Sequence, residues 1–362
     1  MLIVITGAPP TRRLGKRRDS TLRDLAQLAE VHDVPLYVVQ PTDVLYRRGR
    51  PHHMRAYQFV DAVWRPAAVK IVHPIWVDLM YLRELQTADV AYPLLRRRIR
   101  EQNWPCINPV LPGKRKVYDL LRRADISPGR LPLTQKVVRV RDVFDLLKIQ
   151  PIVWLKPELG SGGRNLIRIE RIGIDQFHVQ ADRLRGKRVS RVLTQSQLKV
   201  LARRQLRARR YLVQENIQLP RTADGRRVDF RVTVQKNERG EWATTAITLR
   251  KSARGAVVTN VHAGAIARSL RTSTGRRWLS ETNTTVQELT MVEQAALQAA
   301  RALERTYPDL AYLGVDAAPA NGSCYVYDCN SRPGRDLLSD EEVHRWAERL
   351  VGYVATLLDH RP

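Results

Sequence analysis

Short apolar runs alternate with amphipathic stretches along the chain, a pattern typical of mixed helical and strand structure. Near the start, apolar runs at 2–6 and 35–40 flank a stretch at 20–31 with helical spacing. This order predicts a βαβ unit. We therefore expect a small α/β domain over residues 1–112.

From Gly113 onward the pattern predicts longer strands and two long helices. Ser339 with Glu342 three residues later forms a capping box, which marks the start of the last helix. Asp19 or Ser20 is expected to cap the first helix. We expect helices at 76–85, 114–124, 141–148, 183–210, 284–305 and 340–359, and strands at 151–156, 165–170, 211–219, 229–236, 242–251, 310–318 and 324–330.

The last two predicted strands are joined by Asn321-Gly322, a dipeptide that favours a tight hairpin because both residues tolerate positive φ. In such a hairpin Asp316 lies nearly opposite Asp328 if the turn spans two or three residues, and strand alternation places Asn330 on the same face as Asp328. Carboxylates of this kind, together with substrate phosphates, are typical Mg²⁺ ligands. The hairpin is therefore a candidate metal site; the alternative is a hairpin whose polar residues are solvated.

Composition excludes several classes of protein. No apolar run approaches the roughly 20 residues that span a bilayer, and the apolar start, Met1 to Gly7, has no basic residue before it. We expect that start to be a first strand rather than a signal peptide, and no membrane partner. Three cysteines without a CxxC pair argue against a disulfide framework and favour a reducing, cytoplasmic location.

The net charge of +26 points to anionic partners. The densest basic cluster, Arg183 to Arg210, has leucines at helical spacing but no accompanying helix-turn-helix, zinc-finger or RNA-binding motif. Nucleic acid is therefore kept as an alternative partner. The simpler interpretation is that the surplus charge promotes solubility or attracts acidic substrates.

A glycine-rich loop, Gly160-Ser161-Gly162-Gly163, follows the strand that ends near Lys156. It lacks the GK[ST] of a P-loop, and a strand rather than a helix comes after it. The glycines allow backbone N–H groups to approach phosphate oxygens, while Ser161 adds a hydroxyl donor and Lys156 a positive charge. The alternative is a flexible hairpin tip with an exposed lysine.

Two further strands carry polar residues in apolar surroundings. The segment Gln214-Glu215-Asn216-Ile217 can offer backbone groups to an adenine edge while Ile217 covers the ring. The alternative is an edge strand whose polar residues face water. Asp229 and Arg231 lie on one face of the next strand, where they either serve a ligand or pair with each other.

Arg250, Asn260 and His262 follow these strands. Arginine is suited to forked contacts with phosphate. His262 alone is more often structural than catalytic. The eight histidines show no HExxH or comparable ligand spacing, so zinc is not expected.

The order of these features carries more information than any one of them: a lysine, a lysine with a glycine loop, a Gln-Glu strand, Asp-x-Arg, Arg, Asn, Asp and Asp-x-Asn. From Lys114 to about Arg335, this order resembles the ATP-grasp superfamily. The stretches that begin at Val228 (VDFRVTVQKN) and at Asp328 (DCNSRPGR) most resemble the spore-coat-associated YheC/YheD type. The RimK-type ligases are similar at greater distance.

The resemblance implies an N-terminal α/β pre-ATP-grasp domain followed by an ATP-grasp fold of two α+β subdomains, at 113–215 and 216–362. It also implies ATP and one or two Mg²⁺ ions as cofactors. The implied nucleotide contacts are Lys114 or Lys116, Lys156, the lid Gly160 to Gly163, Gln214, Glu215, Asn216, Ile217, Asp229 near the ribose and Arg231; the implied catalytic residues are Lys156, Arg250 and Asn260; and the implied metal ligands are Asp316, Asp328 and Asn330.

Two positions depart from the pattern of the family. Asp328 stands where a glutamate is usual, which shortens one metal ligand by a methylene group. His262-Ala263-Gly264-Ala265 stands where relatives often have His-Arg-Gly-Gly. This second change removes an arginine contact to an anionic substrate and leaves open whether the site is active.

We expect an ATP-dependent carboxylate–amine ligase, whose partners are small-molecule or peptide carboxylate and amine substrates. His262, Arg332 and Arg335 are candidate substrate contacts, although a solvated turn is the alternative for the two arginines. The resemblance is compatible with a homo-oligomer and with a spore-associated location. Two other functions stay open beside nucleic-acid binding: a small-molecule kinase on the same fold, and a spore-coat structural protein with a vestigial nucleotide site.

Overall fold

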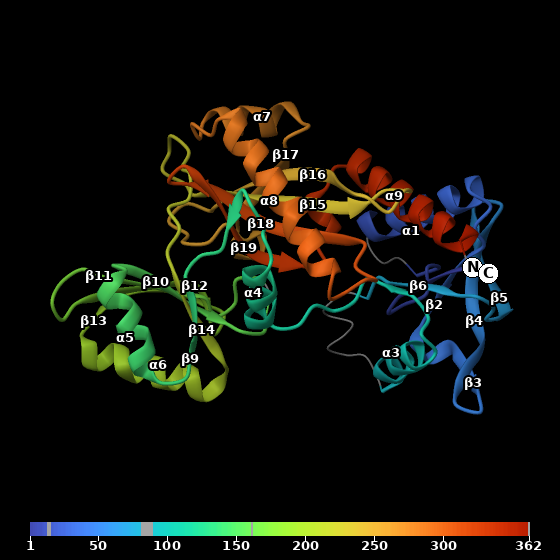
Figure 1. The fold of residues 1–362 in the computed structure, drawn as a ribbon, viewed down its shortest axis with the longest axis horizontal. Coiled ribbons are helices and arrows are strands. Elements are labelled where there is room, and N and C mark those ends of the chain that lie inside the picture. The colour runs from blue at the N-terminus through green and yellow to red at the C-terminus, as the bar shows by residue number, and fades with distance from the viewer. Residues whose placement is uncertain (13–15, 81–89, 161, 361–362) are drawn as a thin grey trace.

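Three sheets lie in a row along the long axis of the molecule, with helices on their faces (Figure 1). The structure is a computed structural model that describes residues 1–12, 16–80, 90–160 and 162–360. The expected mixture of helices and strands is confirmed.

The first sheet is formed by the N-terminal part of the chain. Its centre is parallel, and its strand order is β3-β4-β2-β1-β6-β7, with β5 paired to β4. The expected βαβ opening is confirmed. The elements are β1 (Leu2–Ile5), α1 (Lys16–Val31), β2 (Leu36–Val39), the short turn η1 (Pro41–Asp43), β3 (Val44–Arg47), β4 (Arg50–Val60), β5 (Val63–Lys70), β6 (Ile75–Asp78), α3 (Ala91–Glu101) and β7 (Cys106–Ile107).

Two expectations for this part are wrong. Ile75–Asp78 is a strand rather than the start of a helix, because it is buried on both faces of a parallel sheet, where a continuous apolar run is favoured. The rest of that predicted helix, 81–85, lies outside the described residues. Asp19 and Ser20 lie within the first turns of α1 rather than before it, so neither is its N-cap.

The second sheet is antiparallel, with the order β13-β12-β11-β10-β14-β9. One face packs on α5 and α6, where apolar side chains such as Leu146, Leu155 and Leu198 form a core. The elements are β9 (Thr134–Val137), α5 (Val140–Ile149), β10 (Ile152–Pro157), β11 (Ile167–Arg171), β12 (Phe177–Leu184), β13 (Lys187–Leu193), α6 (Gln195–Ala208) and β14 (Tyr211–Glu215).

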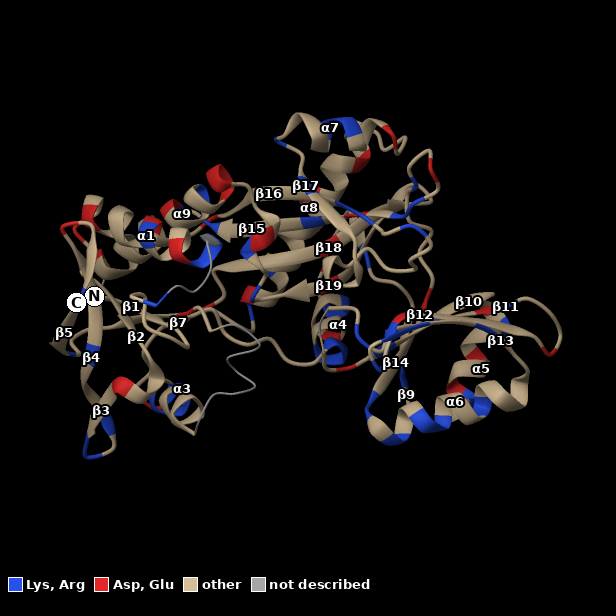
Figure 2. Cartoon of the chain, turned by 180° about the vertical axis from the view of Figure 1, so that it is seen from behind, with Lys and Arg blue, Asp and Glu red and all other residues tan. Residues whose placement is uncertain are grey.

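The expected helix at 183–210 is only partly present. Arg185 and Gly186 both have positive φ, at 50° and 83°, and they close a hairpin between β12 and β13. The helix is therefore confined to 195–208, where the Thr194 hydroxyl caps its start. Its basic residues lie along the outer side of the second sheet (Figure 2).

The third sheet has the order β17-β16-β15-β18-β19-β8, and α8 covers one of its faces. The central strands β15 and β18 are buried along their whole length. The elements are α4 (Lys114–Arg123), β8 (Gly129–Arg130), β15 (Val228–Lys236), β16 (Trp242–Lys251), the turn η2 (Val261–Ala263), β17 (Ile266–Ser269), α7 (Ser273–Ser280), α8 (Val286–Glu304), β18 (Tyr312–Ala320), β19 (Ser323–Asn330), the turn η3 (Arg335–Leu337) and α9 (Asp340–Asp359).

The hairpin of β18 and β19 has the predicted turn and register. Asn321 and Gly322 adopt positive φ, at 51° and 69°, and Asp316 pairs directly with Asp328. The next pair is Ala317 with Val326, so one extra residue lies in β19 between the two pairs. This β-bulge changes which side chains share a face.

The last helix returns to the first sheet. α9 packs beside α1, and Trp346 and Leu350 of α9 share one buried cluster with Leu22 and Leu25 of α1 (Figure 1). The predicted capping box at its start is present: the Ser339 hydroxyl accepts from the N–H of the third helical residue. The last part of the described chain therefore completes the core under the first sheet.

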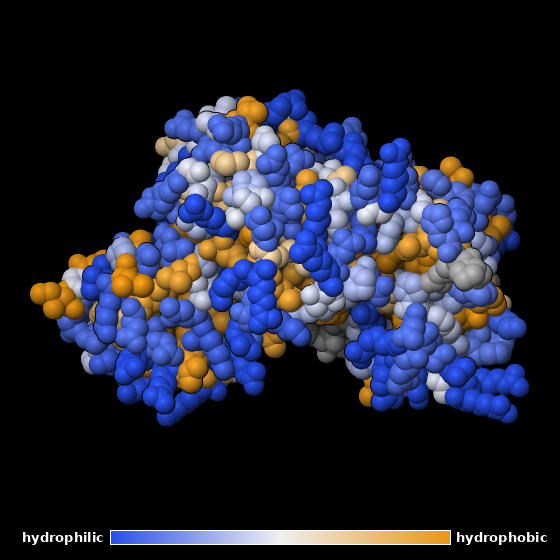
Figure 3. Space-filling model, in the orientation of Figure 1, coloured by the Kyte–Doolittle hydropathy of each residue, from blue (hydrophilic) through white to orange (hydrophobic). Residues whose placement is uncertain are grey.

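The surface agrees with the composition. On the face shown in Figure 3, hydrophilic residues predominate and apolar residues occur in small groups. Of the helices that the structure describes, none is long and apolar enough to cross a bilayer. The boundaries proposed at 112/113 and 215/216 stay a prediction; α4, between them, packs on α8 of the third sheet.

Candidate functional site

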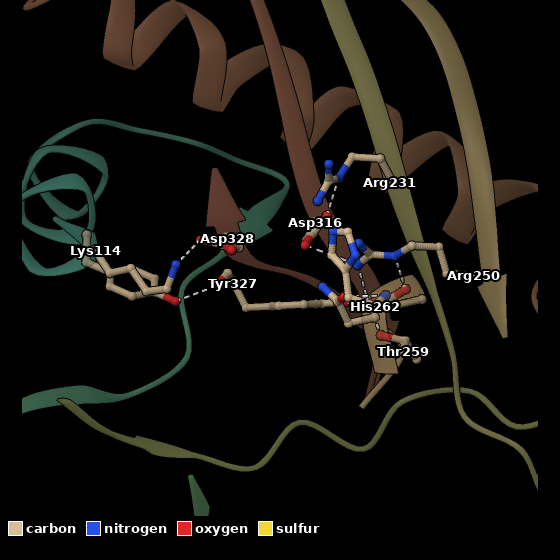
Figure 4. Close-up of polar contacts among 11 residues, drawn as sticks. Lys114, Arg231, Arg250, Thr259, His262, Asp316, Tyr327 and Asp328 are labelled. Carbon is tan, nitrogen blue, oxygen red and sulfur yellow. Dashed lines mark hydrogen bonds and ion pairs between the residues drawn. The ribbon is translucent and has the colours of Figure 1, made fainter. Parts of the chain in front are cut away.

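Lys114, the first residue of α4, connects segments that are far apart in the sequence. Its ammonium group donates to Asp328 Oδ1 at 3.0 Å and to the carbonyl oxygen of Gly160 at 3.4 Å. Figure 4 shows Lys114 extending from α4 toward Asp328 of the β18–β19 hairpin, which is the candidate metal site and is called the metal hairpin below. The start of α4, the glycine loop after β10 and the end of β19 therefore meet at one place.

A buried network of two carboxylates and two guanidinium groups lies on the neighbouring strands (Figure 4). Arg250 donates from Nε and Nη2 to the two carboxylate oxygens of Asp229, at 2.8 and 2.6 Å. The Nη2 atom of Arg250 also lies 3.1 Å from Asp316 Oδ2, and Arg231 Nε donates to Asp316 Oδ1. Two charges of each sign are thus interleaved across β15, β16 and β18.

The alternative that Asp229 pairs with Arg231 is wrong. Asp229 lies directly opposite Arg250, and Arg231 lies directly opposite Asp316. Side chains directly opposite on paired strands are closer than residues two apart on one strand, so the cross-strand partner wins. The network follows from this register.

Burial and charge act against each other at Asp316. Burial alone would raise the pKa of its carboxyl, but Arg231 and Arg250 outweigh that effect and hold the pKa well below its usual value. Burial would lower the pKa of the Arg250 guanidinium, yet the carboxylates of Asp229 and Asp316 keep it raised. Asp316 and Arg250 are therefore charged at neutral pH and hold each other in place.

Two residues that the sequence pattern did not single out complete the network. Thr259 Oγ1 donates to Asp229 Oδ2 at 2.5 Å, and the Tyr327 hydroxyl donates to the same oxygen. Tyr327 is the extra residue of the β-bulge, which brings it to this face. Strict alternation along β19 would have placed the Tyr327 side chain on the opposite face of the sheet from Asp328, so no signal in the sequence identifies it.

Asp229 is fully buried, at 0% exposure, and its carboxylate accepts hydrogen bonds from Arg250, Thr259 and Tyr327. The resemblance implies that Asp229 lies near the ribose, and this stays a prediction. Its geometry is that of a residue that positions Arg250.

Lys156 extends from β10 toward the same hairpin, with Nζ 5.5 Å from the centre of the Tyr327 ring. Burial lowers the pKa of Lys156 to about 8, and the charge of Lys114 adds to that effect, although Asp328 opposes it. At Lys114 burial also lowers the pKa, but Asp328 outweighs it, so the pKa is raised. The two lysines therefore lie at one site in different electrostatic states.

The glycine loop lies against the segment that follows β16. A Cβ atom on Gly162 would lie 3.2 Å from His262 Cδ2, and one on Gly163 would lie 3.5 Å from Asn260 Cβ. The Asn260 side chain accepts from the N–H of His262 at 2.9 Å, which fixes this turn. Ser161 lies outside the described residues. The structure thus brings the predicted loop together with Asn260 and His262.

The segment from Gln214 to Ile217 is not the edge strand that was the alternative, because β14 pairs with β10 on one side and β9 on the other. The buried Gln214 amide donates to two hydroxyl groups, at 2.9 and 2.7 Å. The N–H groups of Glu215 and Asn216 donate to backbone carbonyls at 2.9 and 3.2 Å. An adenine edge would therefore have to use other backbone groups of this segment.

Three predicted residues lie elsewhere. Lys116 is exposed, so Lys114 is the better candidate of the two. Arg332 donates to Asp78 Oδ2 at 2.5 Å, which ties the end of the metal hairpin to the first sheet. Arg335 is buried, with its guanidinium carbon 4.9 Å from the centre of the Trp346 ring. The solvated-turn alternative is therefore wrong for both arginines.

A family model described as YheC/D like ATP-grasp matches residues 103–357, well over half of the chain. The chain belongs to this family. The resemblance found in the sequence is thereby confirmed.

Two relatives of this YheC/D-like chain come from Bacillus subtilis (strain 168). Endospore coat-associated protein YheD is 23% identical over 287 residues, which cover 78% of the chain and 61% of YheD. Endospore coat-associated protein YheC is 24% identical over 287 residues, which cover 77% of the chain and 75% of YheC. The match thus spans less than two thirds of the length of YheD.

Solved structures similar to the YheC/D-like chain are ATP-grasp proteins. D-alanyl-alanine synthetase A from Vibrio cholerae has a TM-score of 0.54 and 12% identity, covering 99% of the chain and 98% of that protein. The ATP-grasp ligase PsnB, complexed with minimal precursor, Mg, and ADP, has a TM-score of 0.52 and 13% identity, covering 98% of both chains. At these identities the likeness shows the fold, and the expected ATP-grasp fold is confirmed.

The chemistry of the metal hairpin fits Mg²⁺. Asp316 and Asp328 lie opposite each other, and Asn330 ends the same strand as Asp328, so the YheC/D-like chain offers hard oxygen donors. Within the part of the chain that the structure describes, no three His, Cys, Asp or Glu side chains gather as a metal site. The candidate set therefore consists of two carboxylates and one amide.

Proposed function

We propose that the chain is an ATP-dependent carboxylate–amine ligase. The γ-phosphoryl group of ATP would pass to an oxygen of a substrate carboxylate, releasing ADP and forming an acyl phosphate. An amine would then attack the acyl carbon, and phosphate would leave as the amide forms. The PsnB complex with minimal precursor, Mg, and ADP supports ATP and Mg²⁺ as cofactors. The PsnB complex with a precursor peptide and the similarity to D-alanyl-alanine synthetase A support a peptide or a small molecule as substrate.

The side chains of this chain would mainly bind and orient the reactants. Lys114 and Lys156 would contact phosphate oxygens, and Arg250, held by Asp229, would meet the terminal phosphate. The glycine loop would cover the phosphates and exclude water. When bound by Asp316, Asp328 and Asn330, Mg²⁺ would neutralise charge on the phosphate oxygens.

One observation carries the proposal: the ammonium group of Lys114 touches both the glycine loop and the acidic hairpin. These three segments are separated by up to 214 positions in sequence. An arrangement in which cations, carboxylates and a glycine loop converge suits the phosphates of ATP together with Mg²⁺. A structural role alone needs no such convergence.

The test compares Lys114→Ala with Lys116→Ala, because the two lysines belong to the same helix and only the first touches the site. We expect Mg·ATP to raise the melting temperature of the native chain and of Lys116→Ala. Lys114→Ala should bind about tenfold more weakly, since a charged contact is worth about 1.5–3 kcal/mol. Equal binding by both variants would contradict the assignment.

The reaction itself is tested by incubating the chain with ATP, Mg²⁺ and panels of acids and amines. A ligase releases ADP and phosphate and yields an amide, which mass spectrometry identifies. A small-molecule kinase, in contrast, leaves the phosphoryl group on its acceptor and releases no phosphate. The ratio of free phosphate to ADP therefore separates these two activities.

A second candidate is a coat-associated structural role, which the printed names of YheD and YheC favour. In that case the nucleotide site would be vestigial, and the chain would associate with spores without binding Mg·ATP. A native chain that shows no thermal shift with Mg·ATP, but does fractionate with spore coats, would support this role over the ligase.

A further inference from the structure

A basic cavity lies outside the Lys114 site, between the second and third sheets. Its volume is about 510 Å³, and its lining comes from β12, the loop at 221–227 and the loop at 252–257. Cavities of about 300–1,000 Å³ commonly hold a small ligand. Figure 2 shows several basic segments on the loops between these two sheets.

The charge of this cavity is unbalanced. Its lining includes four arginines and one carboxylate, Asp224, which lies 2.8 Å from Arg226 Nε. Two other acids nearby already have partners. Asp182 accepts hydrogen bonds from the N–H groups of Val257 and Val258, each at 2.9 Å, and Glu170 pairs with Arg168 at 2.7 Å. The four arginines that line the cavity are Arg221, Arg226, Arg227 and Arg254.

Two of the four guanidinium groups are fixed by backbone carbonyl oxygens. Arg227 donates to the carbonyl oxygen of Ala256 at 3.0 Å, and Arg221 donates to that of Gly225 at 2.8 Å. Burial lowers the pKa of Arg227 to about 10, and the like charges of Arg221 and Arg168 add to the effect. The charged form of Arg227 is therefore disfavoured at this position, and a bound anion would offset that effect.

The cavity continues the strands that carry the buried network. Asp229 pairs with Arg250, and two residues further along the same ladder the N–H of Ser252 donates to the carbonyl oxygen of Arg227 at 2.9 Å. Two strand residues span about 7 Å. The cavity therefore lies about two strand residues from Arg250.

We propose that this cavity binds a doubly charged oxyanion group of the acid that the enzyme activates. That group is either a phosphate ester or a pair of carboxylates. Guanidinium groups suit such groups because their N–H donors match two oxygens at once. The assignment to the acid substrate rests on the proposed ligase function, whereas binding of the anion itself does not.

The test measures anion affinity by calorimetry at constant ionic strength, with inorganic phosphate and succinate as probes and acetate as a singly charged comparison. Titrations are run alone and with a saturating, non-hydrolysable ATP analogue and Mg²⁺, which occupy the nucleotide site. The variant is Arg221→Gln with Arg254→Gln, since both side chains are exposed at the rim. The control is Arg203→Gln with Arg204→Gln, two exposed residues of α6 that remove the same charge.

We expect phosphate or succinate to bind the native chain and the control, and to bind the rim variant about tenfold more weakly. Phosphate alone would identify a phosphate ester, and succinate alone a diacid. Equal affinity in the rim variant, equal weakening in the control, or loss of binding when the nucleotide site is filled would overturn the proposal. If the double variant unfolds, Arg254→Gln alone should still weaken binding about threefold.

A failure of the cavity and a failure of the ligase proposal give different results. If the native chain does not bind the ATP analogue, the ligase proposal is wrong, and the anion titrations without nucleotide still test the cavity. If the native chain binds the nucleotide normally but the rim variant binds the anion as tightly as the native chain, only the proposal for the cavity is wrong.

Discussion

The strand network and the lysine pair lie side by side, yet their charges are balanced differently. In the network, Asp229 and Asp316 meet two arginines. At the lysine pair, Lys114 has Asp328 as its partner, whereas Lys156 faces an aromatic ring and has a lowered pKa. The network is complete by itself, and the lysine pair carries surplus positive charge.

This difference separates two tasks within one site. A buried, balanced network holds its side chains in one geometry, although such a network contributes little net stability. A surplus cation at the edge of that network provides attraction for an anion that arrives later. The fixed part would orient the phosphates, and the unbalanced part would draw them in.

The largest expected effect comes from breaking the network. Asp229→Asn would leave Arg250 with only Asp316 to balance it, and removing one partner of a buried ion pair costs about 3–5 kcal/mol. Urea unfolding of the two chains measures this difference. Asp224→Asn, which changes an exposed carboxylate, is the control and should cost under about 1 kcal/mol. A cost for Asp229→Asn no larger than the control would show that the network is not rigidly required.

A second experiment titrates the lysine pair. Phosphate binding needs Lys156 in its ammonium form, which is lost as pH rises through about 8. The affinity for Mg·ATP should therefore fall about tenfold between pH 7 and pH 9. Lys156→Arg keeps its charge throughout this range, so its affinity should change little. A native profile that is flat over the same range would rule out a lowered pKa at Lys156.

The smallest effect is expected at the glycine loop. Gly162→Ala places a non-glycine residue at φ +71° and within 3.2 Å of His262. Gly186→Ala has a similar φ of +83° but no neighbouring atom within 4 Å. Both should lose about 1 kcal/mol of stability. Only Gly162→Ala should weaken Mg·ATP binding, by about threefold; equal binding by both would show that the loop does not cover the phosphates.

Local signals in the sequence predicted the turn of the β18–β19 hairpin well. The dipeptide Asn321-Gly322 sets the turn and the pairs next to it, up to Ala317 with Val326. The bulge at Tyr327 then makes Asp328, rather than Tyr327, the partner of Asp316. The capping box at Ser339 is similarly local. Features that depend on a few adjacent residues can be predicted because no distant contact competes with them.

The partners within the network could not be predicted in this way. Counting back from the Lys236–Trp242 pair would place Asp229 opposite Leu249, but an irregularity between Thr233 and Val234 shifts the register so that Asp229 faces Arg250. Tyr327 reaches Asp229 for the same kind of reason. A single inserted residue changes the face of every side chain beyond it, and the sequence carries no strong signal for a bulge.

The packing of α9 on α1 has a consequence for synthesis. The ribosome releases the strands of the first sheet and the helix α1 long before residues 340–359 exist. Until then the apolar side of α1, with Leu22 and Leu25, has no Trp346 or Leu350 to cover it. The first sheet and α1 therefore reach their final packing only after α9, which lies far along the chain, has been made.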